Sequence, residues 1–347
     1  MKTSPLLRTL LLCALLPALG FAQATLPAKK VVFTSQLRLS ESDIRELRAA
    51  APSLNIVFPS RESLDAEIAD ADAIVGGINR EQFLSAKKLK WMQATSAGVE
   101  NYLTNIPELR NSPVTLTNMK IVQGIEIADH AFALLLGLTR RIDVAVKDRE
   151  TETWRRLADY GPPLELHGKT AVIIGVGGIG MQIAVRAKAF GMRVIGVDPK
   201  DIPYTPFLDR TVWPDRLDTV LPEADVLFIS APHTPQTDRM IGAEQFARMK
   251  KGVLFIAVSR GKLYDNMALV EALKSGQVAA AGLDVVDTEP LPKGHPLWKT
   301  GRVIITPHIA GRSDEEGPRY FAIYKENLVR FANGEPLRHT VDKEKGY

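Results

Sequence analysis

The sequence of 347 residues contains a single cysteine, Cys13, and no long run of charge of one sign. Cys13 lies in an N-terminal segment that we expect to be removed, so the mature chain has no thiol for a disulfide, a covalent intermediate or a cysteine–metal site. Its 44 basic and 40 acidic residues are mixed, and no basic stripe is interleaved with aromatics. Nucleic acid is therefore not expected as a partner. With 45% hydrophobic residues and no low-complexity stretch, the composition is that of a folded globular protein.

The first 24 residues have the pattern of a secretory signal peptide. Two positive residues, Lys2 and Arg8, precede an apolar stretch from Leu10 to Leu19. Ala22 and Ala24 follow with the spacing of a cleavage site. The stretch is shorter than the about 20 residues that a membrane-spanning helix needs. We predict export to a bacterial periplasm, with no membrane anchor in the mature form. If the signal is not used, the protein stays in the cytoplasm.

Short apolar runs alternate with helical patterns along the rest of the chain. The runs do not alternate between apolar and polar residues, which is typical of parallel strands covered on both faces. We therefore predict an α/β fold of two doubly wound, Rossmann-like domains with parallel sheets. Strands are expected at residues 30–33, 55–58, 73–77, 89–93, 169–174 and 193–197.

A glycine-rich turn follows the strand expected at residues 169–174. It reads Gly175-Val176-Gly177-Gly178-Ile179-Gly180 and matches G-x-G-x-x-G between a strand and a helix, which we expect at residues 181–190. Gly175 permits the tight turn, Gly177 lets the backbone approach a pyrophosphate, and Gly180 lets the helix pack on the strand. The N-terminus of the helix favours the phosphates. The turn predicts a dinucleotide site.

Asp198 ends the next expected strand, 18 positions after Gly180. Its carboxylate can accept hydrogen bonds from the hydroxyls of an adenosine ribose, and it would repel a 2′-phosphate. Lys200 lies two residues further and opposes that repulsion in part. The pattern predicts NAD in preference to NADP.

Three charged residues, Arg260, Asp284 and His308, each follow an expected strand in the second half of the chain, and Glu289 lies five positions beyond Asp284. Because parallel strands bring their carboxyl ends to one ligand crevice, we expect the three to converge beside the nicotinamide. A histidine next to a carboxylate suits proton transfer to a developing alkoxide. A guanidinium can hold a carboxylate and polarise a carbonyl group. This set suits the reduction of a 2-oxo acid.

These motifs, in this order, resemble those of the D-isomer-specific 2-hydroxyacid dehydrogenase family. The likeness covers nearly the whole mature chain and is carried by Gly175–Gly180, Ala231–Pro235, Ser259–Gly261, Gly282–Val285 with Glu289-Pro290, His295–Trp298 and Thr306–His308. Four residues depart from the family pattern. Glu100 stands where aspartate is usual, His233 stands where leucine is usual, and Val258-Ser259 precede the arginine.

The resemblance implies an NAD-dependent oxidoreductase that interconverts a small 2-oxo acid and its D-2-hydroxy acid, of the glyoxylate/hydroxypyruvate reductase type. It implies that Arg260 anchors the substrate, with the backbone amides of Ala97, Gly98 and Val99 on its carboxylate. It makes His308 the acid–base group, with Glu289 as its partner. The residues implied along the cofactor are Gly175, Gly177, Gly178, Ile179, Gly180, Asp198, Ala231, Pro232, Val258, Ser259 and Asp284, the last beside the nicotinamide carboxamide.

The expected architecture is a substrate domain, residues 25–123 and 311–347, split around a nucleotide domain, residues 124–310. A helix from Glu126 begins the insertion, and a final helix with Ser313 as N-cap returns the chain and stops before Gly334. The resemblance implies a homodimer, to which the apolar stretch 128–138 would contribute. No metal is expected, because no His, Asp and Glu residues have the spacing of a metal site.

Two alternatives stay open. The first is a non-catalytic NAD-binding module that regulates or binds a partner; the presence of Arg260, Glu289 and His308 together disfavours it. The second is hydride abstraction from another small acid, such as formate or phosphite. The sequence does not identify the side chain of the substrate.

Overall fold

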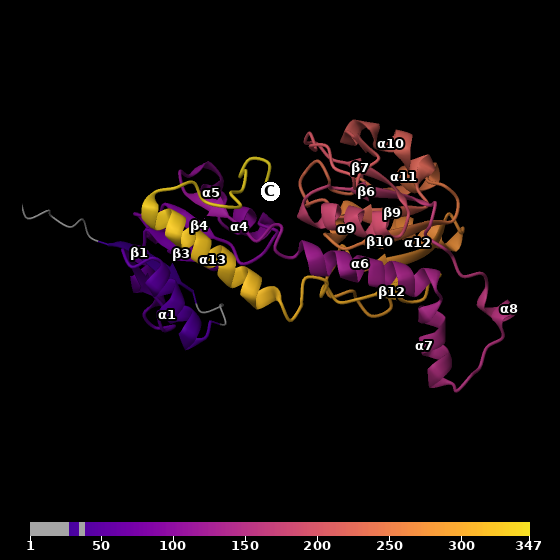
Figure 1. The fold of residues 1–347 in the computed structure, drawn as a ribbon, viewed down its shortest axis with the longest axis horizontal. Helices are drawn as coiled ribbons and strands as arrows, with labels where there is room; N and C mark the ends of the chain where they lie inside the picture. The colour runs from indigo at the N-terminus through magenta and orange to yellow at the C-terminus, as the bar shows by residue number, and fades with distance from the viewer. Residues whose placement is uncertain (1–27, 35–38) are drawn as a thin grey trace, which may run out of the picture.

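The computed structural model describes residues 28–34 and 39–347, so the predicted signal peptide lies outside the described residues. These form two α/β domains side by side (Figure 1). The five-stranded domain has the strand order β2-β1-β3-β4-β5, and the seven-stranded domain has the order β12-β11-β10-β9-β6-β7-β8. Every pair of neighbouring strands in the two sheets is parallel. The predicted fold class is confirmed.

The five-stranded domain takes its last helix from the far end of the chain. Its elements are β1 (Lys29–Phe33), α1 (Glu41–Ala50), β2 (Leu54–Val57), α2 (Leu64–Ala69), β3 (Ala73–Val75), α3 (Arg80–Ser85), β4 (Trp91–Gln93), α4 (Glu100–Asn105), α5 (Pro107–Asn111), β5 (Thr115–Thr117) and α13 (Glu316–Asn333). Tyr324, Leu328 and Phe331 of α13 pack into a core with Phe33 and Trp91. This apolar contact holds the returning helix on the sheet.

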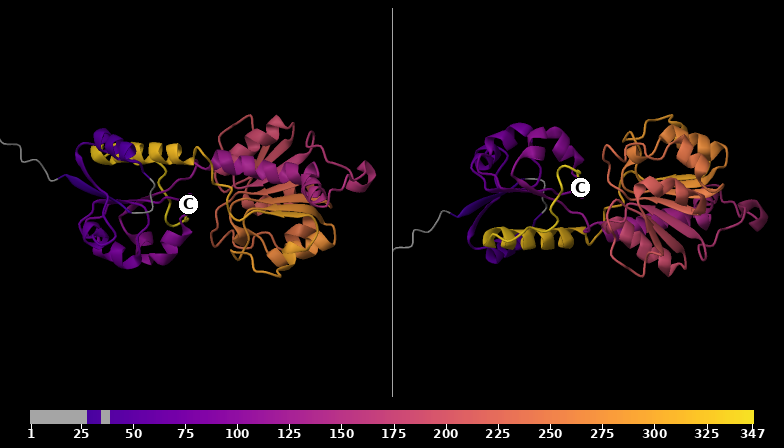
Figure 2. Two further views of the ribbon diagram at one scale, coloured as in Figure 1. Left: turned by 90° about the horizontal axis from the view of Figure 1, so that it is seen from below. Right: turned by 90° about the horizontal axis from the view of Figure 1, so that it is seen from above.

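The seven-stranded domain carries helices on both faces of its sheet (Figure 2). Its elements are α6 (Gly124–Thr139), α7 (Ile142–Glu150), α8 (Leu157–Tyr160), β6 (Thr170–Ile174), α9 (Gly178–Ala189), β7 (Arg193–Val197), β8 (Arg210–Val212), η1 (Pro214–Arg216), α10 (Leu217–Val220), η2 (Leu221–Glu223), β9 (Val226–Ile229), α11 (Ala243–Arg248), β10 (Val253–Ala257), η3 (Gly261–Leu263), α12 (Asn266–Lys274), β11 (Val278–Leu283), η4 (Pro296–Trp298) and β12 (Val303–Ile305). Along β6, Ala171 and Ile173 face α6 and α9, whereas Val172 and Ile174 face the opposite core. Burial on both faces explains why these strands read as continuous apolar runs.

Two predicted helix starts are wrong. The helix α9 begins at Gly178 instead of residue 181, so its first turn lies inside the glycine-rich motif and Gly177 is its N-cap. The helix α13 begins at Glu316, and Ser313 is not its N-cap. Pro318 explains the second difference, because proline lacks an N–H and is tolerated only in the first turn of a helix. A helix starting from Ser313 would place Pro318 beyond that turn.

The chain crosses between the domains twice, and the two crossings touch each other. Gln123 Nε2 donates to the carbonyl oxygen of Gly311 over 3.2 Å. A Cβ on Gly124 would lie 2.8 Å from the carbonyl oxygen of Gly178, and one on Gly178 would lie 2.8 Å from the Cα of Ile121. The first crossing therefore lies directly against the first turn of α9, and the second crossing lies against the first. In the described part of the chain, no helix is long and apolar enough to cross a membrane.

Candidate active site

The glycine-rich turn joins β6 to α9 and leaves an open approach to the end of the helix. Gly175 has a φ of 87°, and a Cβ there would lie 2.5 Å from the Cα of Ala231. A Cβ on Gly180 would lie 1.9 Å from the carbonyl oxygen of Gly175, so the helix packs directly on the turn. At Gly177, no described atom lies within 4 Å of the position that a Cβ would take. Open space at a helix N-terminus fits a pyrophosphate group.

Asp198 follows β7 and points its carboxylate back at this turn. The N–H of Val176 donates to Oδ2 over 2.7 Å, and the N–H of Lys200 donates to Oδ1 over 3.0 Å. Each carboxylate oxygen has lone pairs for about two hydrogen bonds, so each can accept one more. The two free acceptor positions suit the two hydroxyls of a ribose.

The loops after β9 and β10 lie along the same edge of the sheet. Ser230 Oγ donates to the carbonyl oxygen of Gly175 over 2.7 Å, which places Ala231 and Pro232 beside the turn. Val258 and Ser259 are buried. Ser259 Oγ has no hydrogen-bond partner within residues 28–34 and 39–347. Because a buried polar group without a partner costs free energy, this hydroxyl fits a polar group of a bound cofactor.

His308 and Glu289 come together after β12 and β11. Nδ1 of His308 lies 2.7 Å from Oε2 of Glu289, and both side chains are partly exposed. The N–H of Val286 donates to Oε1 of Glu289 over 3.1 Å and fixes the carboxylate. With Nδ1 engaged by the carboxylate, Nε2 is the ring nitrogen left to exchange a proton.

Asp284 holds the turn that carries His308. It is 2% exposed, and its Oδ1 accepts hydrogen bonds from Thr306 Oγ1 (2.6 Å) and the N–H of Ile309 (3.0 Å). Its Oδ2 accepts a hydrogen bond from the N–H of Ala310 over 3.0 Å. His308 has a φ of 54°, a left-handed conformation that costs about 1–3 kcal/mol in a residue other than glycine. The N–H of His308 donates to the Asp284 carbonyl oxygen over 2.9 Å, so Asp284 stabilises this conformation.

His130, which the sequence analysis did not assign, reaches the same turn from α6. Its Nε2 lies 2.8 Å from Thr306 Oγ1 and 3.5 Å from Asp284 Oδ1. Because the Thr306 hydroxyl donates to the carboxylate, it accepts from the Nε2–H of His130. No local pattern marks this histidine, since its partner is 176 positions away in the sequence.

Arg260 joins the two domains. Its Nε donates to Oε1 of Glu100 at the start of α4, and its Nη1 donates to the Ser259 carbonyl oxygen over 2.7 Å. Burial acts to raise the pKa of Glu100, but the Arg260 guanidinium, with a smaller effect from His233, holds that pKa below its ordinary value. A Cβ on Gly98 would lie 1.8 Å from Nη2 of Arg260. The guanidinium therefore lies directly on the backbone of the loop after β4.

That loop presents backbone N–H groups beside the guanidinium. Ser96 Oγ donates to the carbonyl oxygen of Gly98, and Asn118 Nδ2 donates to that of Ala97, both over 2.6 Å. Within the described ranges, the N–H groups of Ala97, Gly98 and Val99 have no protein acceptor. Free N–H groups next to an arginine fit a carboxylate ligand.

The predicted residues thus lie in two groups along one sheet. The group at the glycine-rich turn contains Gly175, Gly177, Gly178, Ile179, Gly180, Asp198, Ala231 and Pro232. The group at β10, β11 and β12 contains Val258, Ser259, Arg260, Asp284, Glu289 and His308, with Ala97, Gly98 and Val99 facing Arg260. Over the part of the chain that the structure describes, no three His, Cys, Asp or Glu residues are grouped as a metal site would need.

Comparisons with known proteins agree with this geometry. Residues 132–310 match the model of the D-isomer specific 2-hydroxyacid dehydrogenase, NAD binding domain. The chain is 35% identical over 295 residues to a glyoxylate reductase of Korarchaeum cryptofilum, covering 82% of this chain and 87% of that protein. It is 36% identical over 293 residues to a D-3-phosphoglycerate dehydrogenase of Archaeoglobus fulgidus, covering 82% of this chain. The match covers 54% of that dehydrogenase, so this chain spans about half its length.

Solved structures show the same fold. A D-isomer specific 2-hydroxyacid dehydrogenase from Xanthobacter autotrophicus Py2, in complex with NADPH and MES, has a TM-score of 0.78 and 25% identity, covering 92% of this chain and 100% of that one. An NADPH-dependent glyoxylate/hydroxypyruvate reductase from Sinorhizobium meliloti, in complex with NADP and sulfate, has a TM-score of 0.76 and 26% identity over the same shares.

The fold and the site define a two-domain α/β oxidoreductase that binds a nicotinamide dinucleotide. The chain belongs to the D-isomer-specific 2-hydroxyacid dehydrogenase family. The resemblance drawn from the motifs is confirmed, and the same relatives favour an enzyme over a non-catalytic NAD-binding module.

Proposed function

We propose that the protein interconverts a small 2-oxo acid and its D-2-hydroxy acid, with glyoxylate and hydroxypyruvate as the first substrates to test. One observation carries the proposal: Arg260 and the His308–Glu289 pair follow three neighbouring strands of the sheet that also carries the dinucleotide turn. The glyoxylate reductase relative matches over most of its own length, whereas the phosphoglycerate dehydrogenase matches over about half. This difference supports the smaller substrates.

The residues divide the chemistry between them. Arg260 and the N–H groups of Ala97, Gly98 and Val99 bind the substrate carboxylate, and the guanidinium polarises the carbonyl group. The bound dinucleotide supplies the hydride. His308 donates a proton from Nε2 to the developing alkoxide, and it takes the proton back in the oxidation. Glu289 orients the ring through Nδ1.

The cofactor in this proposal is NAD. The residues that hold it are Gly175, Gly177, Gly178, Ile179, Gly180, Asp198, Ala231, Pro232, Val258, Ser259 and Asp284. Asp198 disfavours the 2′-phosphate of NADP. Oδ2 of Asp284 accepts one hydrogen bond within the protein, which leaves a lone pair for the nicotinamide carboxamide.

A panel of 2-oxo acids, assayed with NADH and with NADPH at the nicotinamide absorbance, tests the proposal. We expect reduction of glyoxylate or hydroxypyruvate, with NADH preferred. Asp198→Ala should narrow the preference for NADH by removing the repulsion of the 2′-phosphate. NADH binding without reduction of any acid would favour a non-catalytic module, and oxidation of formate or phosphite with NAD would identify the other alternative. Better use of NADPH by the unmodified protein would contradict the cofactor assignment.

We further assign residues 25–123 and 311–347 to a substrate domain and residues 124–310 to a nucleotide domain. The packing of α6 on the seven-stranded sheet supports the first boundary. The packing of α13 on the five-stranded sheet supports the return of the chain to the substrate domain.

A homodimer is also part of the proposal. The segment of α7 and α8 projects from the seven-stranded domain in Figure 1 and exposes apolar side chains: Ile142 is 53%, Val146 is 51% and Trp154 is 98% exposed. The stretch 128–138, by contrast, packs largely into the core of its own domain, so the segment of α7 and α8 is the stronger candidate for the dimer contact. Light scattering should give twice the chain mass, and a monomer at assay concentrations would contradict the dimer.

We propose that the protein is exported, on the sequence pattern of residues 1–24. Fractionated cells should then contain a form beginning near Thr25 in the exported fraction. A cytosolic form that retains Met1 would contradict export and leave the enzymatic proposal unaffected.

A further inference from the structure

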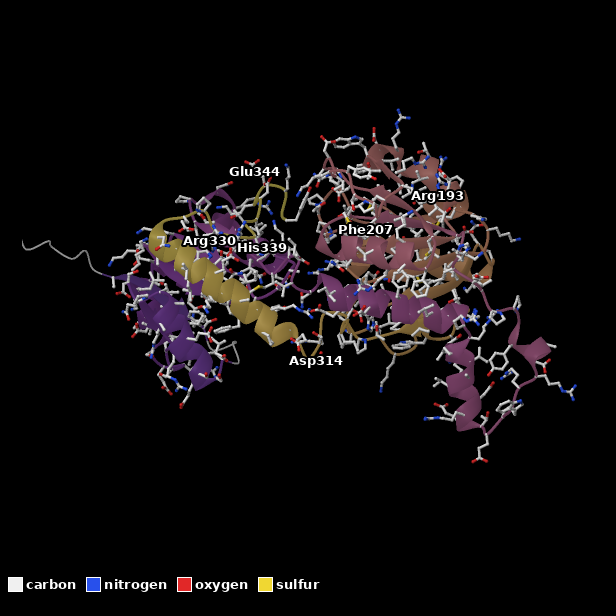
Figure 3. The ribbon with its side chains drawn as sticks, viewed as in Figure 1. Arg193, Phe207, Asp314, Arg330, His339 and Glu344 are labelled. Atoms are coloured by element: carbon white, nitrogen blue, oxygen red, sulfur yellow. The ribbon has the colours of Figure 1, made fainter. Side chains whose placement is uncertain are left out.

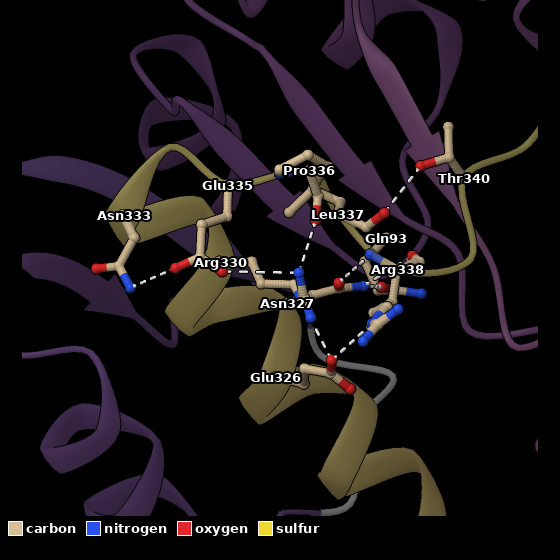
Figure 4. Close-up of polar contacts among 10 residues, drawn as sticks. All are labelled: Gln93, Glu326, Asn327, Arg330, Asn333, Glu335, Pro336, Leu337, Arg338 and Thr340. Carbon is tan, nitrogen blue, oxygen red and sulfur yellow. Dashed lines mark hydrogen bonds and ion pairs between the residues drawn. The ribbon is translucent and has the colours of Figure 1, made fainter.

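Residues 338–347, which we call the closing segment, follow α13 and are fixed to the five-stranded domain at their start. Asn327 of α13 is fully buried, and its Oδ1 accepts a hydrogen bond from the N–H of Arg338 over 2.7 Å. Its Nδ2 donates to the Arg338 carbonyl oxygen over 3.3 Å and to Gln93 Oε1 over 2.9 Å (Figure 4). Arg338 Nε also donates to Oε1 of Glu326 over 2.8 Å. These contacts determine where the closing segment leaves the helix.

The closing segment then runs along β5. Thr340 forms an antiparallel bridge with Thr117, and the N–H of Val341 donates to the carbonyl oxygen of Leu116 over 2.8 Å. Further on, Lys343 Nζ donates to the carbonyl oxygen of Val114 over 2.9 Å. The segment is therefore part of the folded five-stranded domain.

A tight turn follows within the segment. Oδ1 of Asp342 accepts hydrogen bonds from the N–H groups of Glu344 (3.1 Å) and Lys345 (3.0 Å). The N–H of Asp342 donates to the carbonyl oxygen of Tyr347 over 3.1 Å, and the N–H of Gly346 donates back to that of Asp342 over 2.8 Å. Figures 1 and 2 show the end of this turn, marked C, between the two domains, and Figure 3 labels Glu344 within it.

Tyr347 meets the seven-stranded domain at the adenosine end of the candidate cofactor site. Its ring centroid lies 4.5 Å from Lys200 Nζ, a distance at which a cation is attracted to the face of a ring. The N–H of Lys200 is one of the two donors to the Asp198 carboxylate. Burial and the charge of Asp198 raise the pKa of Tyr347, so the phenol stays neutral at neutral pH. The ring thus lies on the side chain of Lys200, two residues from the carboxylate assigned to the ribose.

We propose that Tyr347 is a cofactor-binding residue contributed by the five-stranded domain, whose ring stacks on the adenosine half of the nicotinamide dinucleotide beside Asp198 and Lys200. The inference rests on dinucleotide binding at the turn of Gly175–Gly180. An aromatic ring stacks on any purine face, and Lys200 can pair with a pyrophosphate oxygen once the ring lies on the base. Binding of the adenosine half then joins the two domains at a point remote from the acid–base pair.

Fluorescence titration with NADH tests this on the full chain. Tyr347→Ala should raise the Kd by about five- to tenfold, whereas Tyr347→Phe should leave it nearly unchanged because the ring is kept. Glu344→Ala is the matched control, since this exposed side chain lies in the same turn. ADP-ribose should show the same loss as NADH in Tyr347→Ala, and nicotinamide mononucleotide, which lacks the adenosine, should show none.

Equal Kd values for NADH in Tyr347→Ala and the unmodified protein would overturn the proposal. Failure of the unmodified protein to bind NADH would overturn it together with the proposed function, so the two failures are distinguishable. If Tyr347→Ala lowers the melting temperature, a change in Kd could reflect loss of folding. Hydrogen exchange on the unmodified protein then tests whether the dinucleotide contacts the closing segment. ADP-ribose should then slow exchange in the closing segment, and unchanged exchange there would overturn the proposal.

Discussion

Two charged pairs flank the candidate site, and they are built differently. His308 and Glu289 come from loops after the neighbouring strands β12 and β11, so one domain sets their 2.7 Å contact. Arg260 and Glu100 lie 160 positions apart and belong to different domains, so their contact depends on how the domains meet. The first pair is complete as soon as the seven-stranded domain folds.

The difference separates the two chemical tasks of the site. Proton transfer needs a fixed ring nitrogen, which a pair within one domain provides. In the proposed mechanism Arg260 binds the substrate carboxylate, yet a carboxylate of the protein itself occupies that guanidinium. A substrate must therefore share Arg260 with Glu100 or displace it. The His308–Glu289 pair, which we call the acid–base half, is therefore preformed. At Arg260, which we call the anion-binding half, the substrate competes with Glu100.

Removal of the imidazole should have the largest effect. His308→Gln should lower kcat for 2-oxo acid reduction by about 10²–10⁴-fold, because the proton donor is lost. The Kd for NADH should not change. His167→Gln, an exposed histidine before β6, is the matched control. Turnover retained in His308→Gln would mean that the preformed pair is not the acid–base group.

Loosening the turn that carries the ring should come next. In Asp284→Asn, an amide nitrogen replaces one of the two acceptors facing Ile309, Ala310 and Thr306, so His308 is held less firmly. We expect kcat to fall by about 10²-fold. The free energy of unfolding, measured with urea, should fall by about 1–3 kcal/mol. Loss of stability with unchanged kcat would limit Asp284 to a structural role.

Glu289→Gln sharpens the comparison by removing charge and keeping shape. The amide oxygen can still accept from Nδ1, so the ring stays in place, but the charged imidazole loses its neighbouring negative charge. The pH–rate profile for reduction should shift to lower pH, since the proton donor is available over a smaller range. A profile that does not move would remove Glu289 from this role.

Glu100→Gln tests whether Glu100 competes with the substrate for Arg260. Without the rival carboxylate, Arg260 should bind the substrate more readily, and KM for the 2-oxo acid should fall about two- to fivefold, the worth of a partly exposed ion pair. Glu108→Gln, which removes the pair with Arg80 in the same domain, is the control. A rise in KM would show instead that Glu100 positions Arg260 for the substrate.

The smallest effect is expected on the free energy of unfolding in acid, to which the Arg260–Glu100 pair contributes. Because Arg260 holds the pKa of Glu100 below its ordinary value of 4.5, the pair contributes stability above that pH and loses it as the pH falls further. The difference in unfolding free energy between the unmodified protein and Glu100→Gln, less than about 1 kcal/mol near neutral pH, should therefore shrink below about pH 4.5. A constant difference down to pH 3 would contradict this.

The parts of the site that the sequence predicted are those that depend on local order. The turn at Gly175–Gly180 lies between a strand and a helix, and Arg260, Asp284 and His308 each follow a strand, so the parallel sheet alone brings them to one edge. Such positions follow from chain direction and need no knowledge of side-chain conformation. The fold class was predictable from the continuous apolar runs, which are typical of parallel strands buried on both faces.

The partners of these residues were not predictable. Arg260 pairs with Glu100 and His130 with Thr306 across 160 and 176 positions, and each pairing depends on rotamers and on the placement of another domain or helix. Lys200 meets Tyr347 for the same reason. The start of α13 was predicted wrongly because Ser313 is a favourable N-cap residue, whereas Pro318 requires the helix to start later.

The first crossing between the domains lies against the first turn of α9, where a Cβ on Gly124 or Gly178 would meet backbone atoms, and the second crossing contacts the first through Gln123. A rotation of one domain against the other would turn about these crossings, so atoms near Gly178 would move least. The pyrophosphate would then rest at the pivot, and the dinucleotide could enter or remain while the substrate end stands open. Kinetics should accordingly be ordered, with the dinucleotide binding first and leaving last.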